Sequence, residues 1–138
     1  MRGPILLVVL FVSVCRMNAQ EEKIEYQHND ELDYYYRLPS GWNLVENEAK
    51  LFPLVIYLHG GGGYGKFEGL GYLAYSDGAF QSTCPSFVLV PQSKKGWDPG
   101  KITPLIESFK LMYPVDNRCI YLIGYSMGGS GSYILANG

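Results

Sequence analysis

The amino-acid sequence predicts an α/β fold, with a mostly parallel β-sheet and helices on both faces of that sheet. Three short, continuous apolar runs occupy 54–58, 87–90 and 120–123, and such runs are typical of strands that are buried on both faces. Apolar residues at helical spacing lie between the last two runs. Strands that alternate with helices form parallel sheets, which the helices cover.

The strands are expected in the following places. The segment 32–38 is rich in aromatic residues and Pro39-Ser40-Gly41 follows it, a pattern that predicts a strand and then a turn. A polar connector over 46–50 leads to the apolar strand 54–58. The strands 87–90 and 120–123 complete the predicted sheet.

Two helices are expected in the second half of the chain. Apolar residues recur at helical spacing from Ile102 to Met112, and Pro114 stops that helix. Asp98 precedes a proline and is expected to cap the helix or to form a turn there. A further helix should begin near Ser126.

Composition excludes several classes of protein. The chain has 138 residues, of which 47% are hydrophobic and 17% are charged, so it can bury a core and is not intrinsically disordered. The formal net charge is −2 and no basic stripe is present, which argues against nucleic acid as the main partner. No apolar run is long enough for a membrane-spanning helix.

The first 19 residues match a secretory signal peptide. Arg2 is followed by an apolar run over 5–15, and the small residue Ala19 is a suitable last residue before cleavage. We therefore expect a secreted or periplasmic protein whose residues 20–138 belong to a single domain.

Removal of that segment leaves Cys84 and Cys119. In an oxidising compartment they could form one disulfide, but two separate buried thiols are the favoured expectation. No CxxC motif and no Cys/His cluster occurs, so the sequence predicts neither a metal site nor a cofactor.

The segment Gly124-Tyr125-Ser126-Met127-Gly128 matches the pattern G-x-S-x-G at a predicted strand-to-helix turn. Such a turn holds the serine in a strained conformation, with its hydroxyl exposed as a nucleophile. Side chains at Gly124 and Gly128 would collide, and Gly129 and Gly131 would let the helix pack tightly on the strands. The alternative is a glycine-rich turn with an incidental serine.

His59 and four glycines, Gly60 to Gly63, follow the strand 54–58 directly. Glycines leave backbone N–H groups accessible, and acyl transfer needs such donors for the oxyanion of its tetrahedral intermediate. The N–H of Gly61 or Gly62, together with that of Met127, would form this oxyanion hole. The alternative is a flexible loop.

The two histidines and Trp97 also bear on a possible site. His59 is expected to shape the glycine loop by hydrogen bonding rather than to act as the catalytic base. His28 lies in a polar stretch and is expected at the surface. Trp97 could line an acyl pocket, and packing in the core or at the surface is an equal alternative.

The segments YYYRLPSGW, PLVIYLHGGGG, FVLVPQ and CIYLIGYSMGGSGSYIL resemble the α/β-hydrolase superfamily. Within it they are most similar to secreted esterases of the feruloyl-esterase and polyhydroxybutyrate-depolymerase type. The resemblance covers about residues 30–138. It implies Ser126 as nucleophile, backbone N–H groups of Gly61 and Met127 as oxyanion donors, and a small-molecule or polymeric ester as substrate.

The resemblance also implies a catalytic acid and then a histidine after the nucleophile. Only 12 residues follow Ser126, and none is Asp, Glu or His. We therefore expect a fragment that ends in the helix after the nucleophile. Three functions stay open: a serine esterase, a peptidase similar to prolyl oligopeptidase, or a non-catalytic module with the same fold.

Overall fold

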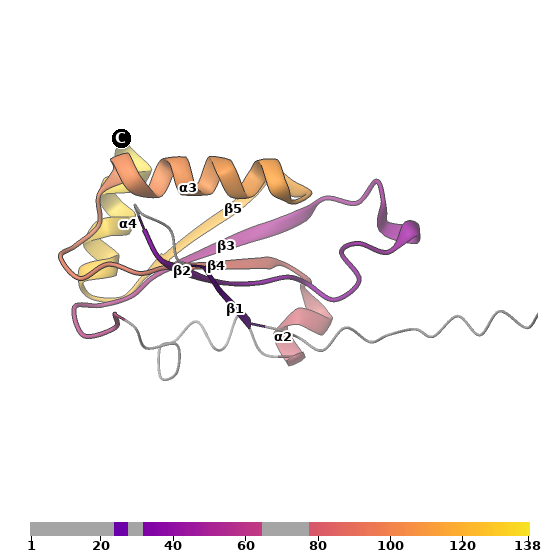
Figure 1. The fold of residues 1–138 in the computed structure, drawn as a ribbon, viewed down its shortest axis with the longest axis horizontal. Coiled ribbons are helices and arrows are strands. Elements are labelled where there is room, and N and C mark those ends of the chain that lie inside the picture. The colour runs from indigo at the N-terminus through magenta and orange to yellow at the C-terminus, as the bar shows by residue number, and fades with distance from the viewer. Residues whose placement is uncertain (1–23, 28–31, 65–77) are drawn as a thin grey trace, which may run out of the picture.

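The computed structural model describes residues 24–27, 32–64 and 78–138 (Figure 1). The expected signal peptide over 1–19 and His28 lie outside the described residues. The described residues form one mixed β-sheet with helices on both sides.

The sheet has five strands in the order β1-β2-β4-β3-β5. The strands are β1 (Ile24–Gln27), β2 (Tyr34–Arg37), β3 (Phe52–Leu58), β4 (Phe87–Pro91) and β5 (Val115–Gly124). β3 pairs in parallel with both β4 and β5, whereas β2 pairs antiparallel with β1 and β4. The three apolar runs therefore form a parallel centre, as the sequence predicts, and the antiparallel strands extend it on one side.

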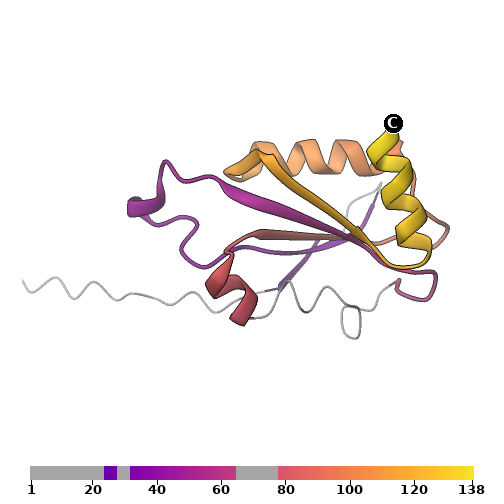
Figure 2. The same ribbon diagram turned by 180° about the vertical axis from the view of Figure 1, so that it is seen from behind.

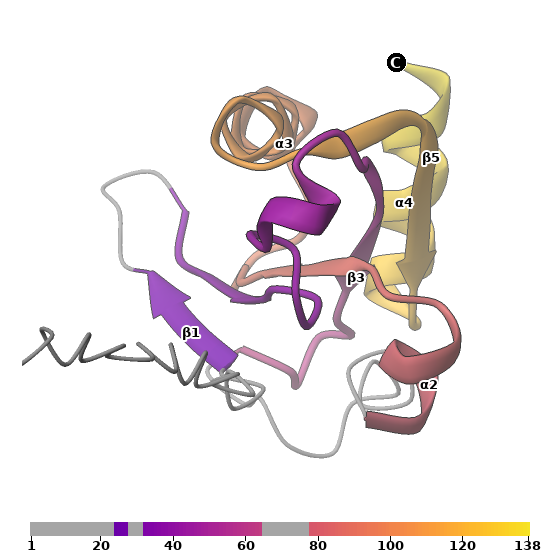
Figure 3. The same ribbon diagram turned by 90° about the vertical axis from the view of Figure 1, so that its right-hand side faces the viewer.

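The helices lie on both faces of this sheet. α3 (Pro99–Met112) and α4 (Met127–Asn137) contact each other on one side, and α2 (Gly78–Thr83) lies on the other. Views from behind and from the side show the same arrangement (Figures 2 and 3). The predicted helix cap is confirmed, because the Asp98 carboxylate accepts a hydrogen bond from the Gly100 N–H at 2.9 Å.

The core divides between the two faces of the sheet. The larger cluster joins one face of β3 and β4 to α3, where Ile102, Leu105 and Phe109 are buried. The smaller cluster, Tyr57, Val88 and Val90, lies on the other face. Every residue of β4 is buried, which explains why this strand is continuously apolar.

The expected set of helices and strands was incomplete, and the expectation for the two cysteines was wrong. β1, α2 and the short 3-10 helix η1 (Val45–Asn47) were not predicted, and β5 begins earlier than expected, at Val115. Cys84 and Cys119 are separate thiols, but Cys84 is exposed and Cys119 is partly exposed. The expectation of buried thiols was wrong because Cys84 follows the end of α2 and Cys119 lies in β5 directly after the polar residues 116–118, so neither is inside an apolar run.

Candidate active site

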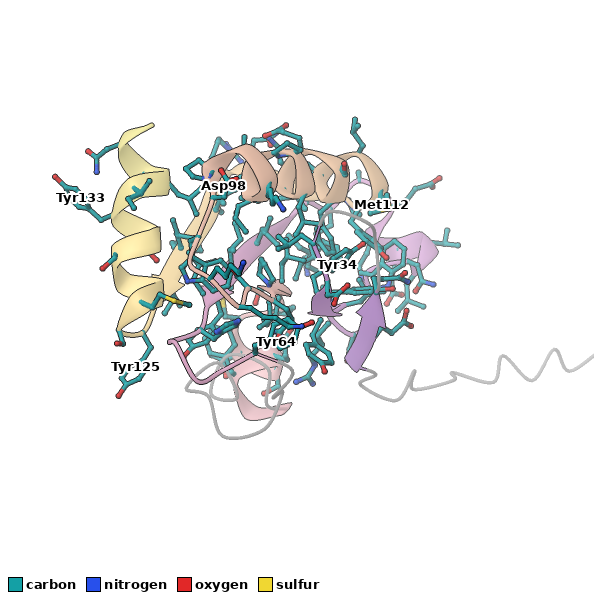
Figure 4. All side chains as sticks on the ribbon, turned by 60° about the vertical axis from the view of Figure 1, so that its left-hand side comes forward. Tyr34, Tyr64, Asp98, Met112, Tyr125 and Tyr133 are labelled. Carbon is teal, nitrogen blue, oxygen red and sulfur yellow. The ribbon has the colours of Figure 1, made fainter. Side chains whose placement is uncertain are left out.

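Ser126 occupies the sharp turn between β5 and α4. Its φ and ψ are 52° and −113°, and it is the only non-glycine residue of the described segments with a positive φ. Side chains rarely adopt this conformation because the Cβ crowds the backbone. Ser126 is exposed, and its hydroxyl does not cap α4. The neighbouring Tyr125 also projects into solvent at this turn (Figure 4).

The glycines around Ser126 differ in how much space they have. A Cβ on Gly124 would lie 2.0 Å from the Gly128 carbonyl oxygen, and a Cβ on Gly131 would lie 2.4 Å from Cδ1 of Trp97. The collision expected between Gly124 and Gly128 is therefore confirmed, whereas the tight packing at Gly131 is against Trp97 in the loop before α3 and not against a strand. The expectation for Gly129 was wrong, because its Cβ would make only an ordinary contact, 3.7 Å from the Gly124 oxygen.

The glycine loop lies directly against this turn. A Cβ on Gly60 would approach Cδ1 of Tyr125 to 3.1 Å and the Cβ of Ser126 to 3.5 Å. Parallel β3 and β5 both end at this edge of the sheet, which is why motifs 67 positions apart in the sequence meet here. The contact to Ser126 runs through Gly60, whereas the sequence singled out Gly61 and Gly62.

Gly61 and Gly62 are exposed, and a Cβ on either would meet nothing within 4 Å. Gly63 has no such freedom, because its Cβ would lie 2.6 Å from the Cβ of His59. The Gly63 N–H donates to the Gly60 carbonyl at 3.0 Å. The loop is therefore a closed turn with two open glycines at its tip.

His59 is fully buried and both of its ring nitrogens have partners. Its Nδ1 lies 2.7 Å from the Gly60 carbonyl oxygen, and its Nε2 accepts from the Ser93 N–H at 3.1 Å. A carbonyl needs a donor and an N–H needs an acceptor, so we assign the neutral ring with its proton on Nδ1. Burial lowers the pKa of His59 and favours this neutral form. His59 thus fixes the loop and leaves no nitrogen free to serve Ser126.

Trp97 packs in the core cluster with 8% of its surface exposed. Its indole N–H donates to the His59 carbonyl at 3.3 Å, and its ring meets the His59 ring edge to face at 4.8 Å. Of the two roles that the sequence left open, this geometry is that of core packing beneath the glycine loop.

Backbone donors are available around Ser126. The first N–H groups of a helix have no partner within the helix, and α4 begins at Met127. Among the described residues, no hydrogen bond occupies the N–H of Gly61, Gly62 or Met127. The described side chains likewise supply no hydrogen bond to the Ser126 hydroxyl.

A group that the sequence did not single out joins the loop to its neighbours. The Tyr64 hydroxyl donates to the Asp33 carboxylate at 3.3 Å, and the Lys94 ammonium lies 4.4 Å from the centre of the Tyr64 ring. Asp33 precedes β2 and Lys94 follows β4. Only the strand order could have revealed this group, because the three residues are far apart in the sequence.

Within the part of the chain that the structure describes, no group of three or more His, Cys, Asp or Glu side chains could hold a metal ion. No helix in that part is long and apolar enough to cross a membrane.

Two solved structures share this arrangement. One is a thermostable esterase, with a TM-score of 0.61, 24% identity and coverage of 86% of this chain and 38% of that chain. The other is an ester hydrolase from the metagenome of Lake Arreo in complex with a bipyridine phosphonate derivative, with a TM-score of 0.52, 15% identity and coverage of 86% and 39%. No protein-family model and no curated protein matches the sequence. The described chain therefore has the α/β fold of these esterases and spans less than two fifths of their length.

Proposed function

We propose that this chain carries the nucleophile and the oxyanion hole of a carboxylic ester hydrolase. Ser126 attacks the ester carbonyl and forms an acyl-enzyme, and the alcohol leaves. The strained φ of Ser126 in an exposed strand-to-helix turn is the single observation that supports this most strongly.

The glycine loop supports the second part of the proposal. A tetrahedral intermediate places negative charge on the former carbonyl oxygen. The N–H of Met127 begins α4, where the helix dipole is positive, and the loop with Gly61 and Gly62 packs against the same turn through Gly60. These N–H groups are our proposed oxyanion donors.

The proposed substrate class rests on the fold neighbours and on the sequence resemblance. Two fold neighbours are described as esterases, and the sequence resembles esterases of the feruloyl-esterase and polyhydroxybutyrate-depolymerase type. We therefore propose small-molecule or polymeric carboxylic esters, met outside the cytoplasm after removal of the leader.

Activation of Ser126 requires a general base, because a serine hydroxyl is a weak nucleophile. His59 cannot take this part while its two nitrogens bond Gly60 and Ser93. No described histidine is therefore free to act as the base, and a test on this chain should provide one from solution.

The test is Ser126 acylation with added imidazole as the external base. The chain is mixed with a p-nitrophenyl ester or a fluorophosphonate, with and without imidazole, and the modified residue is located by mass spectrometry. Ser126→Ala under identical conditions corrects for hydrolysis by imidazole itself. We expect labelling at Ser126 that imidazole accelerates.

Absence of any Ser126-dependent reaction, with the fold verified by circular dichroism, would overturn the proposal. The chain would then be a non-catalytic module with this fold. Equal labelling of Ser126 and of other exposed serines, such as Ser130, would also overturn it, because it would mean that Ser126 is not activated.

A further inference from the structure

The glycine loop is held at both of its ends. At the first end, buried His59 bonds the Gly60 carbonyl and the Ser93 N–H. At the second end, Tyr64 bonds Asp33 and lies under Lys94. Between these ends, a Cβ atom on Gly61 or Gly62 would meet nothing within 4 Å, so nothing packs against the tip of the loop.

We propose that Tyr64 is a positioning residue for the oxyanion donors of this loop, with Asp33 and Lys94 as its partners. This inference rests on the proposed function, since it concerns the loop that would receive the oxyanion. Tyr64 acts through the backbone and need not touch the substrate.

The need for a second anchor follows from the chemistry of glycine and of oxyanion holes. Glycine has more backbone freedom than any other residue, so an unrestrained Gly61-Gly62 tip would sample many orientations of its N–H groups. Oxyanion stabilisation depends on donors that are already oriented before charge develops. His59 bonds Gly60 and packs against Gly63, and Tyr64 holds the chain directly after the turn.

Two contacts of Tyr64 and one hydrogen bond of the preceding residue suit Tyr64 to this task. Its hydroxyl reaches Asp33, whose own carbonyl accepts the Gln92 N–H at 2.8 Å, so the anchor is tied to the ends of β2 and β4. Its ring accepts the Lys94 ammonium, a contact that is favourable at exposed sites. The turn hydrogen bond from Gly63 to Gly60 lies directly before Tyr64 and would transmit the restraint to the tip.

The experiment measures amide hydrogen exchange by NMR in the full chain and in two variants. Tyr64→Phe removes the hydroxyl but keeps the ring under Lys94, and Tyr64→Ala removes both. The Gly63 N–H, bonded to Gly60, probes the loop. The Tyr125 N–H, bonded to Leu58 at 3.1 Å, is an internal reference for the rest of the site.

We expect exchange of Gly63 to accelerate about threefold in Tyr64→Phe and about tenfold or more in Tyr64→Ala. Exchange of Tyr125 should stay the same. Tyr133→Ala, which removes an exposed tyrosine from α4, is the matched control and should alter neither amide.

A second measurement tests the link to chemistry. The imidazole-assisted acylation of Ser126 should slow by a similar factor in Tyr64→Ala, through the maximal rate and not through KM, because the lost donors act mainly in the transition state.

The outcomes separate this inference from the proposed function. Unchanged Gly63 exchange in Tyr64→Ala overturns the inference whatever happens at Ser126. Equal acceleration of Gly63 and Tyr125 also overturns it, because Tyr64 would then support the whole site. Faster Gly63 exchange with an unchanged Ser126 acylation rate overturns the catalytic part. If Ser126 of the parent chain never reacts, the proposed function fails, and the exchange data alone decide whether Tyr64 positions the loop.

Discussion

A Cβ atom on Gly128 would lie 1.8 Å from the carbonyl oxygen of Leu58. Leu58 ends β3 immediately before the glycine loop, and Gly128 lies in the first turn of α4 beside Ser126. This one backbone approach therefore sets how closely the proposed nucleophile and the proposed oxyanion loop can lie.

The first prediction compares two adjacent glycines of α4. Gly128→Ala should destabilise the chain by at least about 3 kcal/mol or prevent folding, because backbone atoms cannot yield to a 1.8 Å contact. Gly129→Ala has room, and should stabilise the helix by about 0.5–1 kcal/mol. Urea denaturation of both variants checks this. Equal stabilities would mean that α4 does not rest on β3 as described.

The second prediction separates folding from catalysis in the glycine loop. Gly61 has open space around its Cβ position and no positive φ, so Gly61→Ala should leave stability within about 0.5 kcal/mol. A methyl group beside the oxyanion should nevertheless slow Ser126 acylation by roughly 10²–10³. Denaturation and labelling rates, measured on one preparation, provide the test. A rise in KM with an unchanged maximal rate would identify a substrate-binding loop instead.

The third prediction concerns strain at Ser126. Glycine adopts a positive φ at no steric cost, so Ser126→Gly should remove the reactive hydroxyl and yet raise stability by about 1 kcal/mol. Ser130→Gly, at an ordinary position of α4, is the control and should lower stability by about 0.5 kcal/mol. Thermal melts of the two variants should therefore shift in opposite directions. A lower melting temperature for Ser126→Gly would show that the turn is unstrained.

The sequence predicted the centre of the fold better than its periphery. Strands β3 and β4 are buried throughout or nearly so, and burial on both faces leaves a continuous apolar run. β1 has the sequence IEYQ and α2 has GAFQST. The alternation in IEYQ covers only four residues and GAFQST covers less than two helical turns, so neither segment carries a strong local signal, and tertiary packing holds both in place. The antiparallel pairing of β2 likewise depends on long-range contacts.

The candidate site shows the same division. G-x-S-x-G and His59 with its glycines are local patterns, so the amino-acid sequence alone reveals them. The anchoring of Gly63 against His59, the bond from Ser93 to His59, and the group of Tyr64 with Asp33 and Lys94 join distant segments. Such contacts cannot be predicted from a local sequence pattern, because they join residues that are distant in the sequence.

The fourth prediction is a loss of stability in mild acid that depends on His59. Burial lowers its folded pKa below the ordinary value of 6.5. As the pH falls through 6.5, the unfolded chain binds a proton that the folded chain does not. Stability is therefore fully present above that pH and falls below it, by at most about 1.4 kcal/mol per pH unit, until the folded pKa is reached.

Chemical denaturation at a series of pH values checks this prediction. The His59→Gln variant has no titrating group at this position, so its stability should change less between pH 7 and pH 5 than that of the parent. Parallel pH profiles of the two proteins would contradict the assignment of a neutral, buried His59.

The last prediction concerns β5, which forms one edge of the described sheet. Tyr121 of this strand is 52% exposed, and the segment Ile120–Ile123 pairs through its backbone with β3 on one side. An exposed apolar edge strand is a template for pairing with another chain, and a charge on such a strand opposes that pairing. Tyr121→Lys should therefore reduce concentration-dependent association, measured by light scattering or sedimentation.

Tyr133→Lys makes the same change of charge on the outer face of α4 and should have a smaller effect, because a helix face offers no unpaired strand hydrogen bonds. Equal improvement in the two variants would point to net charge rather than to the edge of β5 as the cause of association.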